Sequence, residues 1–336
     1  MAIIRAIDVG FGNTKYTLGR HGEVVTCRMF PSLVPEPAET TAGADVLTGR
    51  RKTVKVTVGN STYEVGPDVE RVIGTRDGRS LHRDFAMTDE YLALAHGAMT
   101  YMGQEHIDLL VVGLPVNASR ERYQAVEERM RGEHVMGNGR LVNVKRVAAV
   151  AQPMGGFIDY AAKNNLMREI QQETSLLIDV GFFTLDWVVA RGPETMAGRS
   201  GGYDAGVSEI LKRINTAIKK DLKCDDISIN RLDHGLRDGS IRLFGEAYEM
   251  SRWLGAGDAA INEGMNALQA KVGASDDIDN IFVCGGGGDF YVEEIRKRFP
   301  RHAVKMVDDP VFANVRGFQL LGEIKWKGIA SAQAAA

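Results

Sequence analysis

Hydrophobic and polar residues follow two alternating patterns along this chain. Residues 107–116, IDLLVVGLPV, form a continuous apolar run, which is typical of a strand buried on both faces. Residues 206–222 instead place apolar side chains three and four positions apart, which predicts a helix with one buried face. Runs of the two kinds alternate through most of the sequence, and we therefore expect an α/β fold.

Turn and capping residues suggest where the other elements begin and end. Thr88 and Ser119 are expected to cap helices, because a hydroxyl accepts from the free N–H groups of a first turn. The predicted elements are hairpins over 3–19 and around Asn60, helices over 88–103, from Ser119 to near Gly132, over 157–172, over 245–272 and from near Phe312, and a strand, glycine turn and helix over 280–299.

A short motif occurs twice in the chain. Asp8-Val9-Gly10-Phe11 returns as Asp179-Val180-Gly181-Phe182, and each copy follows an apolar run and precedes a threonine. Two equivalent strand–turn–strand units at corresponding places predict a duplicated α/β domain with a cleft between the copies.

Length and charge limit the classes of function. A chain of 336 residues suits two domains. Its net charge of −3 and pI of about 6.2 give no general attraction to nucleic acid or to anionic lipid. We therefore expect no direct nucleic-acid partner and no membrane partner.

The cysteines and the apolar runs indicate the compartment. Cys27, Cys224 and Cys284 lie far apart and form no C-x-x-C pair, which disfavours a disulfide framework and a zinc site. The amino terminus does not resemble a signal peptide, and no apolar run is long enough to span a bilayer. We expect a cytoplasmic protein.

The first copy of the motif has the chemistry of a phosphate-binding turn. Gly10 and Gly12 allow a tight turn whose backbone N–H groups can approach an anion. Asn13 and Thr14 add side-chain donors, and Lys15 adds a positive charge suited to phosphate.

The acidic residues of the two motifs predict a metal between them. Asp8 would repel a phosphate directly, but a hydrated Mg²⁺ held by one or two carboxylates can bridge to it. Asp179, Gly181 and Thr184 would supply the second half of this arrangement. A single D-x-G-x-G is usually only a β-turn, whereas two copies in equivalent places are more specific. Neither copy is a Walker or a Rossmann motif, since no G-x-x-x-x-G-K-[ST] occurs and a strand follows each turn.

A run of four glycines, Gly285, Gly286, Gly287 and Gly288, joins a predicted strand to a predicted helix. Helix amino termini attract anions, and a backbone without side chains can lie close to a base or a phosphate. A flexible connector is the alternative, but ordering four glycines costs backbone entropy. The run therefore favours close approach of a ligand.

These elements resemble the actin-like ATPase superfamily over nearly the whole chain. In order, they are similar to the family's first phosphate loop (8–15), first connecting segment (149–156), second phosphate loop (179–186), adenosine loop (283–288) and second connecting segment (308–322). The segments GYDAGVSEI, GGGGDFYVEEIRKRF and PVFANVRGFQLLG are most similar to the ParM/StbA plasmid-segregation actins, including protein D of the PRTRC systems. The resemblance implies two duplicated ribonuclease H-like domains with a nucleotide cleft between them.

The resemblance also implies domain limits. Domain I would comprise 1–155 and 311–330, with a small inserted subdomain at about 33–80. Domain II would comprise 156–310, and 331–336 would be a disordered tail.

The family mechanism can be carried over by position. Asp8 and Asp179 would hold Mg²⁺, and the loop around Lys15 would contact the β- and γ-phosphates of ATP. Gln152 would orient the attacking water, so that Gln152 and Asp179 are the expected catalytic residues. The expected nucleotide-binding residues are Gly10, Gly12, Asn13, Thr14, Lys15, Gly181, Phe182, Phe183, Thr184, Glu209 and the four glycines at 285–288.

Two features lie outside the family pattern or are only loosely defined by it. Phe182 and Phe183 stand where relatives often have glycine or a small polar residue, so they point away from the phosphate or weaken its binding. Further candidates for base and ribose contacts are Lys212, Arg231 and Asp233, for which a solvated surface is the alternative.

Three functions are compatible with these observations. The first is an ATPase, or also a GTPase, that forms filaments and moves plasmid or other mobile DNA through a DNA-binding adaptor. The second is a small-molecule kinase of the same fold, and the third is a nucleotide switch that does not polymerise.

Overall fold

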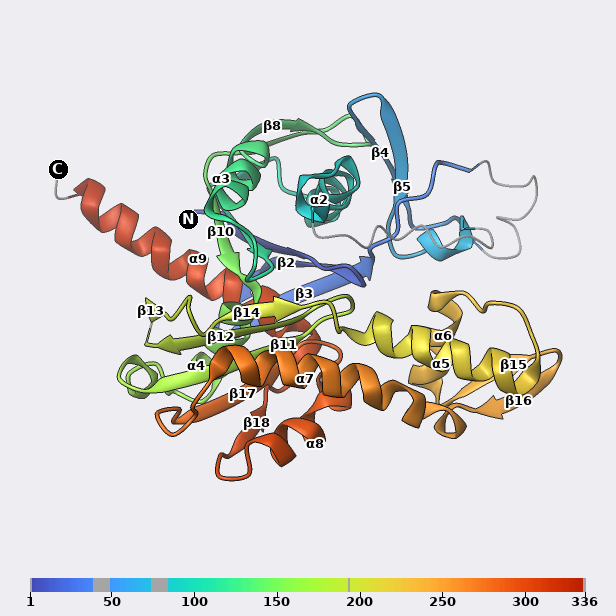
Figure 1. Ribbon diagram of the computed structural model, residues 1–336. Coiled ribbons are helices and arrows are strands. Elements are labelled where there is room, and N and C mark those ends of the chain that lie inside the picture. Colours follow the sequence, from blue (N-terminus) through green and yellow to red (C-terminus); the bar gives the residue numbers. More distant parts are fainter. Residues whose placement is uncertain (1, 39–48, 74–83, 193, 335–336) are drawn as a thin grey trace.

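Two β-sheets form the frame of the molecule, and in Figure 1 the first lies above the second. The computed structural model describes residues 2–38, 49–73, 84–192 and 194–334. The first sheet has the strand order β10-β7-β1-β2-β3. Its strands are β1 (Ile4–Val9), β2 (Asn13–His21), β3 (Val24–Pro31), β7 (Leu109–Leu114) and β10 (Val147–Ala151).

The second sheet repeats the central arrangement of the first. It has the order β13-β12-β11-β17-β18, with β14 also paired to β12. Its strands are β11 (Thr174–Val180), β12 (Leu185–Arg191), β13 (Glu194–Thr195), β14 (Gly201–Tyr203), β17 (Asn280–Cys284) and β18 (Val304–Met306). In both sheets the motif hairpin is antiparallel and its first strand also pairs in parallel with a later strand, β7 or β17. The predicted duplication is therefore confirmed.

Two helices connect the halves of the chain and cross each other between the sheets. Helix α4 (Gln152–Lys163) follows β10, and α9 (Pro310–Ala334) follows the second sheet and packs on α4, β1 and β7. A Cβ on Gly317 would lie 1.8 Å from the carbonyl oxygen of Gly155, so only glycine allows this close crossing.

The sequence-based limits of α4 were wrong. We expected a helix over 157–172, but α4 begins at Gln152 because Pro153 is well suited to a first turn. It ends at Lys163, and Asn165 then adopts a left-handed conformation with φ of 56° before the short helix η3 (Glu169–Gln171).

The first half carries an additional layer outside its sheet. Helix α2 (Asp89–Met102) packs on β2 and on the hairpin of β4 (Val54–Val58) and β5 (Ser61–Val65). Thr88 and Ser119 cap α2 and α3 (Arg120–Arg129) as predicted, each accepting a backbone hydrogen bond from the first turn. The remaining elements are η1 (Val69–Arg71), η2 (Phe85–Met87), β6 (His106–Ile107), β8 (Gly132–Val135) and β9 (Leu141–Val144). Within the predicted subdomain over 33–80, residues 39–48 and 74–80 lie outside the described residues.

Helices cover the second sheet and extend beyond it. They are α5 (Val207–Leu222), α6 (Ile229–Asp238), η4 (Met250–Arg252), η5 (Leu254–Gly257), α7 (Asp258–Val272) and α8 (Gly288–Arg298). The predicted helix over 245–272 was wrong in its first half. There the hairpin of β15 (Ser240–Leu243) and β16 (Glu246–Glu249) turns at Phe244 and Gly245, both with positive φ, which a helix interior excludes.

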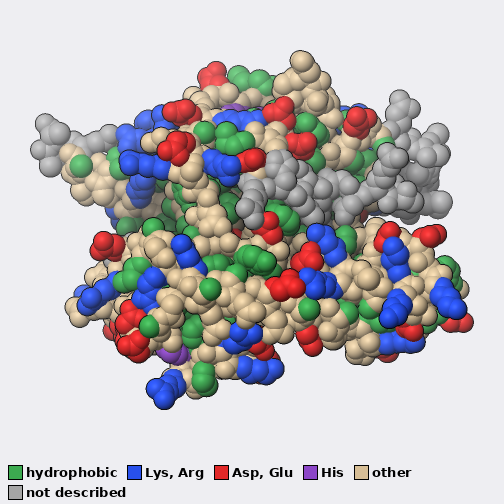
Figure 2. All heavy atoms as spheres, viewed as in Figure 1, with side chains coloured by type: hydrophobic (Ala, Val, Ile, Leu, Met, Phe, Trp, Pro, Cys, Tyr) green, Lys and Arg blue, Asp and Glu red, His purple; other side chains and the backbone are tan. Residues whose placement is uncertain are grey.

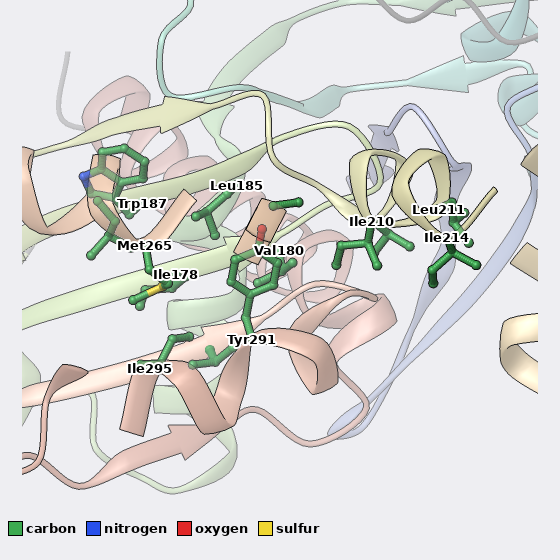
Figure 3. Packing of buried hydrophobic residues seen from close by; sticks show 14 of the residues in the cluster. Ile178, Val180, Leu185, Trp187, Ile210, Leu211, Ile214, Met265, Tyr291 and Ile295 are labelled. Atoms are coloured by element: carbon green, nitrogen blue, oxygen red, sulfur yellow. The ribbon is translucent and has the colours of Figure 1, made fainter. Parts of the chain in front are cut away.

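Each half has its own apolar core. In the second half, Ile178 and Val180 of β11 face Ile210 of α5 and Ile295 of α8, and Tyr291 fills the space between them (Figure 3). All of these side chains are almost completely buried. The predicted apolar stripe of residues 206–222 supplies the α5 side of this core.

The carboxyl terminus differs from the prediction. We expected residues 331–336 to be a disordered tail, but α9 continues to Ala334, since alanine has the highest helix propensity. Residues 335–336 lie outside the described residues. Among the described helices, none combines the length and the apolar character needed to cross a membrane.

Candidate functional site

A cavity of about 470 Å³ lies where the two motif hairpins meet. Most of the predicted site residues line it: Asp8, Gly10, Gly12, Asn13, Lys15, Gln152, Asp179, Gly181, Phe182, Thr184, Gly285, Gly286 and Gly287. They come from both halves of the chain and from the start of α4. The prediction that the two hairpins face one shared cavity is thus confirmed in its geometry.

The two hairpin turns have the same backbone form and touch each other. Each is closed by a hydrogen bond over three residues, from Gly10 N–H to the Asn13 carbonyl at 3.2 Å and from Gly181 N–H to the Thr184 carbonyl at 2.9 Å. A Cβ on Gly12 would lie 2.9 Å from the Cβ of Phe182, so a side chain there would push the turns apart.

The first hairpin places a balanced pair of charges in the cavity. Asp8 and Lys15 are register partners across β1 and β2, and the lysine Nζ lies 3.0 Å from the carboxylate Oδ2. Burial alone lowers the pKa of Lys15, but the neighbouring carboxylates, Asp8 above all, raise it overall. Gln152 also holds Asp8, because its Nε2 donates to Asp8 Oδ1 at 2.8 Å.

The second hairpin places two carboxylates at the equivalent positions. Asp179 and Asp186 are register partners across β11 and β12. Burial, followed by the charge of Asp8, raises the pKa of Asp179 to about 6. Burial also raises the pKa of Asp186 to about 7, although a hydrogen bond from Thr184 opposes this. This hairpin has no lysine of its own.

Asn314 of α9 is a site residue that the sequence analysis missed. Its Nδ2 donates to Asp179 Oδ2 at 2.6 Å, and its Oδ1 accepts from Gly156 N–H at 3.0 Å. Asn314 is buried and joins the second acidic residue to the first turn of α4. The predicted second connecting segment, 308–322, contains Asn314, but nothing in that segment indicates which side chain faces the cavity.

The glycine-rich turn forms a third wall. Gly285 has φ of +84°, and a Cβ at this position would lie 2.2 Å from Asp179 Oδ1. Gly287 N–H binds the Val180 carbonyl at 2.9 Å, which holds the turn against the second hairpin. Helix α8 then begins at Gly288. Glycine at 285 is therefore required both by backbone conformation and by close approach.

The cavity is also lined by residues that the sequence analysis did not assign or left open. They are Phe11, Met29, Asp186, Val207, Asp233, Leu236, Arg237, Asp289, Phe290, Val311 and Asn314. Asp233, which was one of several candidates for base contacts, accepts a hydrogen bond from Arg237 at 2.7 Å on α6. The helical spacing of these two residues could have indicated their pairing, but not that α6 reaches the cavity.

Four predicted residues do not line the cavity. Thr14 is fully buried and its hydroxyl is hydrogen-bonded to Ser32. Phe183 packs on Phe11, with ring centroids 4.7 Å apart. The remaining two are Glu209, whose carboxylate binds Lys212 and Arg213, and Gly288, which faces Met306.

The donor set fits a hydrated magnesium ion better than a protein-enclosed metal. No group of three or more His, Cys, Asp or Glu residues could hold a metal ion within the described part of the chain. Asp8 and Asp179 nevertheless line one cavity, and Mg²⁺ keeps most of its water ligands while using one or two carboxylates.

Comparisons with known proteins assign both halves of the chain to actin-like families. Residues 6–155 match the family described as the N-terminal domain of actin-like proteins. Residues 177–297 match the C-terminal family of MreB-like archaeal actin homologues. No curated protein sequence matches the chain.

Solved structures of actin homologues share the fold. The archaeal actin homologue Ta0583 is 19% identical with a TM-score of 0.76, and the match covers 96% of this chain and 99% of that one. The ParM protein of a 15-stranded filament from Clostridium botulinum is 20% identical with a TM-score of 0.75 and the same coverage. Bacillus thuringiensis ParM with AMPPNP is 12% identical with a TM-score of 0.62, over 97% and 99% of the two chains. Two ribonuclease H-like domains, two matching families and the shared cavity together show that this chain is an actin-like protein.

Proposed function

We propose that the chain binds a nucleoside triphosphate with Mg²⁺ in the cavity between its two hairpins and hydrolyses it. One observation carries this proposal: Asp8 and Asp179, from two copies of one motif, face the same cavity between glycine turns. Two of the structural relatives are described with a nucleotide, Ta0583 with ADP and Bacillus thuringiensis ParM with AMPPNP.

The chain's own groups divide the binding work. The backbone N–H groups of the two turns and Lys15 would hold the phosphate end of the ligand. The bare backbone of Gly286, where a Cβ would meet only Val311 at 3.8 Å, would leave room for a flat group, and Leu236 and Phe290 offer apolar surface in the same cavity. Magnesium, held by Asp8 and Asp179 through water, would supply charge neutralisation of the phosphates.

Gln152 would position a water rather than remove its proton. Its Nε2 donates to Asp8, so its amide oxygen is the group that could accept a hydrogen bond from a water in the cavity that Gln152 lines. An amide is a poor base, so the residue orients a nucleophile and catalysis stays slow. Slow hydrolysis would set how long a filament persists before it disassembles.

Self-assembly and DNA segregation form the second part of the proposal. A ParM relative with the same fold is described as a filament, which supports polymerisation here. The slight negative charge of the chain agrees with indirect contact to plasmid or other mobile DNA through a DNA-binding adaptor.

Calorimetry and pelleting test the two parts separately. We expect ATP with Mg²⁺ to bind in a one-to-one ratio, with weaker binding in EDTA, and to bring the chain into the pellet. The exposed Asp276→Asn variant serves as the control, because Asp276 lies outside the cavity. Absence of binding heat with both ATP and GTP would overturn the nucleotide proposal. Binding without assembly, with turnover stimulated by a sugar, would support the kinase alternative.

A further inference from the structure

A second concave surface lies on the first half of the molecule, away from the hairpins. We call it the basic groove, and it measures about 430 Å³. Four cations, Arg131, Lys145, Arg146 and Lys325, line it together with Leu109, Val147 and Ile329. Arg131 follows the end of α3, Lys145 and Arg146 lie in the turn before β10, and Lys325 lies on the outer part of α9. Figure 2 shows Lys and Arg side chains gathered beside that part of α9.

Among the described residues, the cations of the basic groove have only one acidic neighbour, Asp108, on which Lys145 acts electrostatically. None of its four cations takes part in an ion pair with a residue that the structure describes, and no acidic residue lines it. The neighbouring Asp108 already accepts hydrogen bonds from Ile3 N–H at 2.8 Å and from His106 at 3.1 Å. Arg146 lies over the ring of Trp326, 5.8 Å from its centroid. Since the whole chain has a net charge of −3, this concentration of positive charge is local.

The floor of the basic groove is apolar. Leu109 and Val147 are buried beneath it, and Ile329 is half-buried at its side. Cations around an apolar floor match a ligand that has carboxylates beside apolar side chains. A phosphodiester backbone would leave the floor unfilled, and a flat bilayer would not enter a concave surface.

We propose that the basic groove is a docking site for an acidic peptide segment of a partner protein, with one or two apolar anchors between its carboxylates. The proposal is independent of nucleotide binding, because the groove shares no residue with the cavity between the hairpins. It places a partner on the outer part of α9, the helix that also carries Asn314 at its inner end.

Fluorescence anisotropy with the full chain tests the proposal. The probe is a labelled short peptide of glutamate and leucine, and the comparison probes are the matching lysine–leucine peptide, a labelled duplex oligonucleotide and vesicles with anionic lipid. We expect saturable binding of the acidic peptide that weakens with added salt, and weaker binding of the other three. Tighter binding of the duplex or the vesicles than of the acidic peptide would overturn the proposal, as would absence of saturable binding of that peptide.

Charge-reversal variants locate the site. The double variant Lys145→Glu and Lys325→Glu should weaken peptide binding by at least about tenfold. The control is Lys220→Glu, because Lys220 is an exposed lysine on α5 in the other half of the molecule. Ile329→Ser should weaken binding by about threefold by removing apolar surface at the side of the basic groove. Equal effects of the double variant and the control would contradict the proposed location. Unchanged melting temperatures exclude loss of fold as the cause.

Discussion

The two motif hairpins differ at one position that decides their electrostatics. In the first, Asp8 is the register partner of Lys15, and in the second Asp179 is the register partner of Asp186. The first hairpin therefore neutralises its own carboxylate, whereas the second has two buried carboxylates whose pKa values are raised to about 6 and about 7. The first hairpin thus gives the cavity a neutral pair of charges, and the second gives it two carboxyl groups. The second hairpin therefore favours a cation bound between the two hairpins.

Each hairpin is also tied to a different connecting helix. Gln152 at the start of α4 donates to Asp8, and Asn314 on α9 donates to Asp179. Because α4 and α9 cross at Gly155 and Gly317, a movement of one half against the other would change both contacts. The acidic pair is therefore positioned by the same helices that join the two halves.

The largest expected effect comes from removing the charge of the second hairpin. Asp179→Asn should lower Mg²⁺-dependent ATP hydrolysis by about 100- to 1,000-fold, because the carboxylate facing Asp8 is lost. Phosphate release at saturating ATP measures this, with Asp276→Asn as the matched control. Normal turnover of Asp179→Asn would refute its assignment as a metal-binding residue.

Removal of the negative charge of Asp8 in the first hairpin should mainly lower the free energy of unfolding. Asp8→Asn leaves Lys15 without its buried partner, and breaking a buried ion pair from one side costs about 3 kcal/mol. Urea unfolding in EDTA without nucleotide measures the free energy of unfolding. A loss below about 0.5 kcal/mol would contradict this prediction. It would show that the Asp8–Lys15 pair contributes as little as an ion pair on the surface does.

A substitution of Gln152, at the start of α4, tests the contact of this helix with the first hairpin. Gln152→Ala should slow hydrolysis by about tenfold or more and leave ATP affinity nearly unchanged, because the residue orients water rather than the ligand. Calorimetry and single-turnover hydrolysis separate the two quantities. A large loss of affinity would assign Gln152 a structural role through Asp8 instead.

Asp186→Asn should raise the free energy of unfolding near pH 7, whereas Asp8→Asn should lower it. The pKa of Asp186 lies above its unfolded value, so the folded state binds more protons between about pH 4 and pH 7 and the wild type loses stability as pH rises through this window. The variant should remove the contribution of Asp186 to this slope, which for one group is at most about 1.4 kcal/mol per pH unit, while Asp179 keeps its own contribution below about pH 6. Its amide can keep hydrogen bonds with Thr184 and Val116 N–H. Unfolding in EDTA at several pH values tests this, and an unchanged slope would contradict it.

The smallest expected effect concerns Asn314. Asn314→Ala removes a donor to Asp179, and we expect the Mg²⁺ concentration for half-maximal hydrolysis to rise by about three- to tenfold. Asn314→Asp should be worse, because it adds a like charge beside a carboxylate. Asp276→Asn should leave the Mg²⁺ requirement unchanged, and an equal shift in that control would show that the effect does not arise from the contact of Asn314 with Asp179.

The elements that the sequence predicted well are those with local causes. Hydroxyl caps at Thr88 and Ser119, the apolar stripe of α5 and the turn glycines Gly10 and Gly285 depend on residues within one turn of the chain. The limits of α4 and the β15–β16 hairpin were mispredicted, because a helical pattern of apolar residues does not reveal residues with positive φ such as Asn165 and Phe244.

The sequence by itself determined the duplicated α/β fold and the shared cavity. The repeated motif and the glycine turns take their backbone conformation from residues that are adjacent in the sequence. Only the tertiary structure decided that Asn314 holds Asp179, that Asp186 stands where the first hairpin has Lys15, and that α6 brings Asp233 to the cavity. The physical reason is distance along the chain. A buried carboxylate takes its hydrogen-bond partner and its pKa from whichever element packs against it, and that element is chosen by the fold rather than by neighbouring residues.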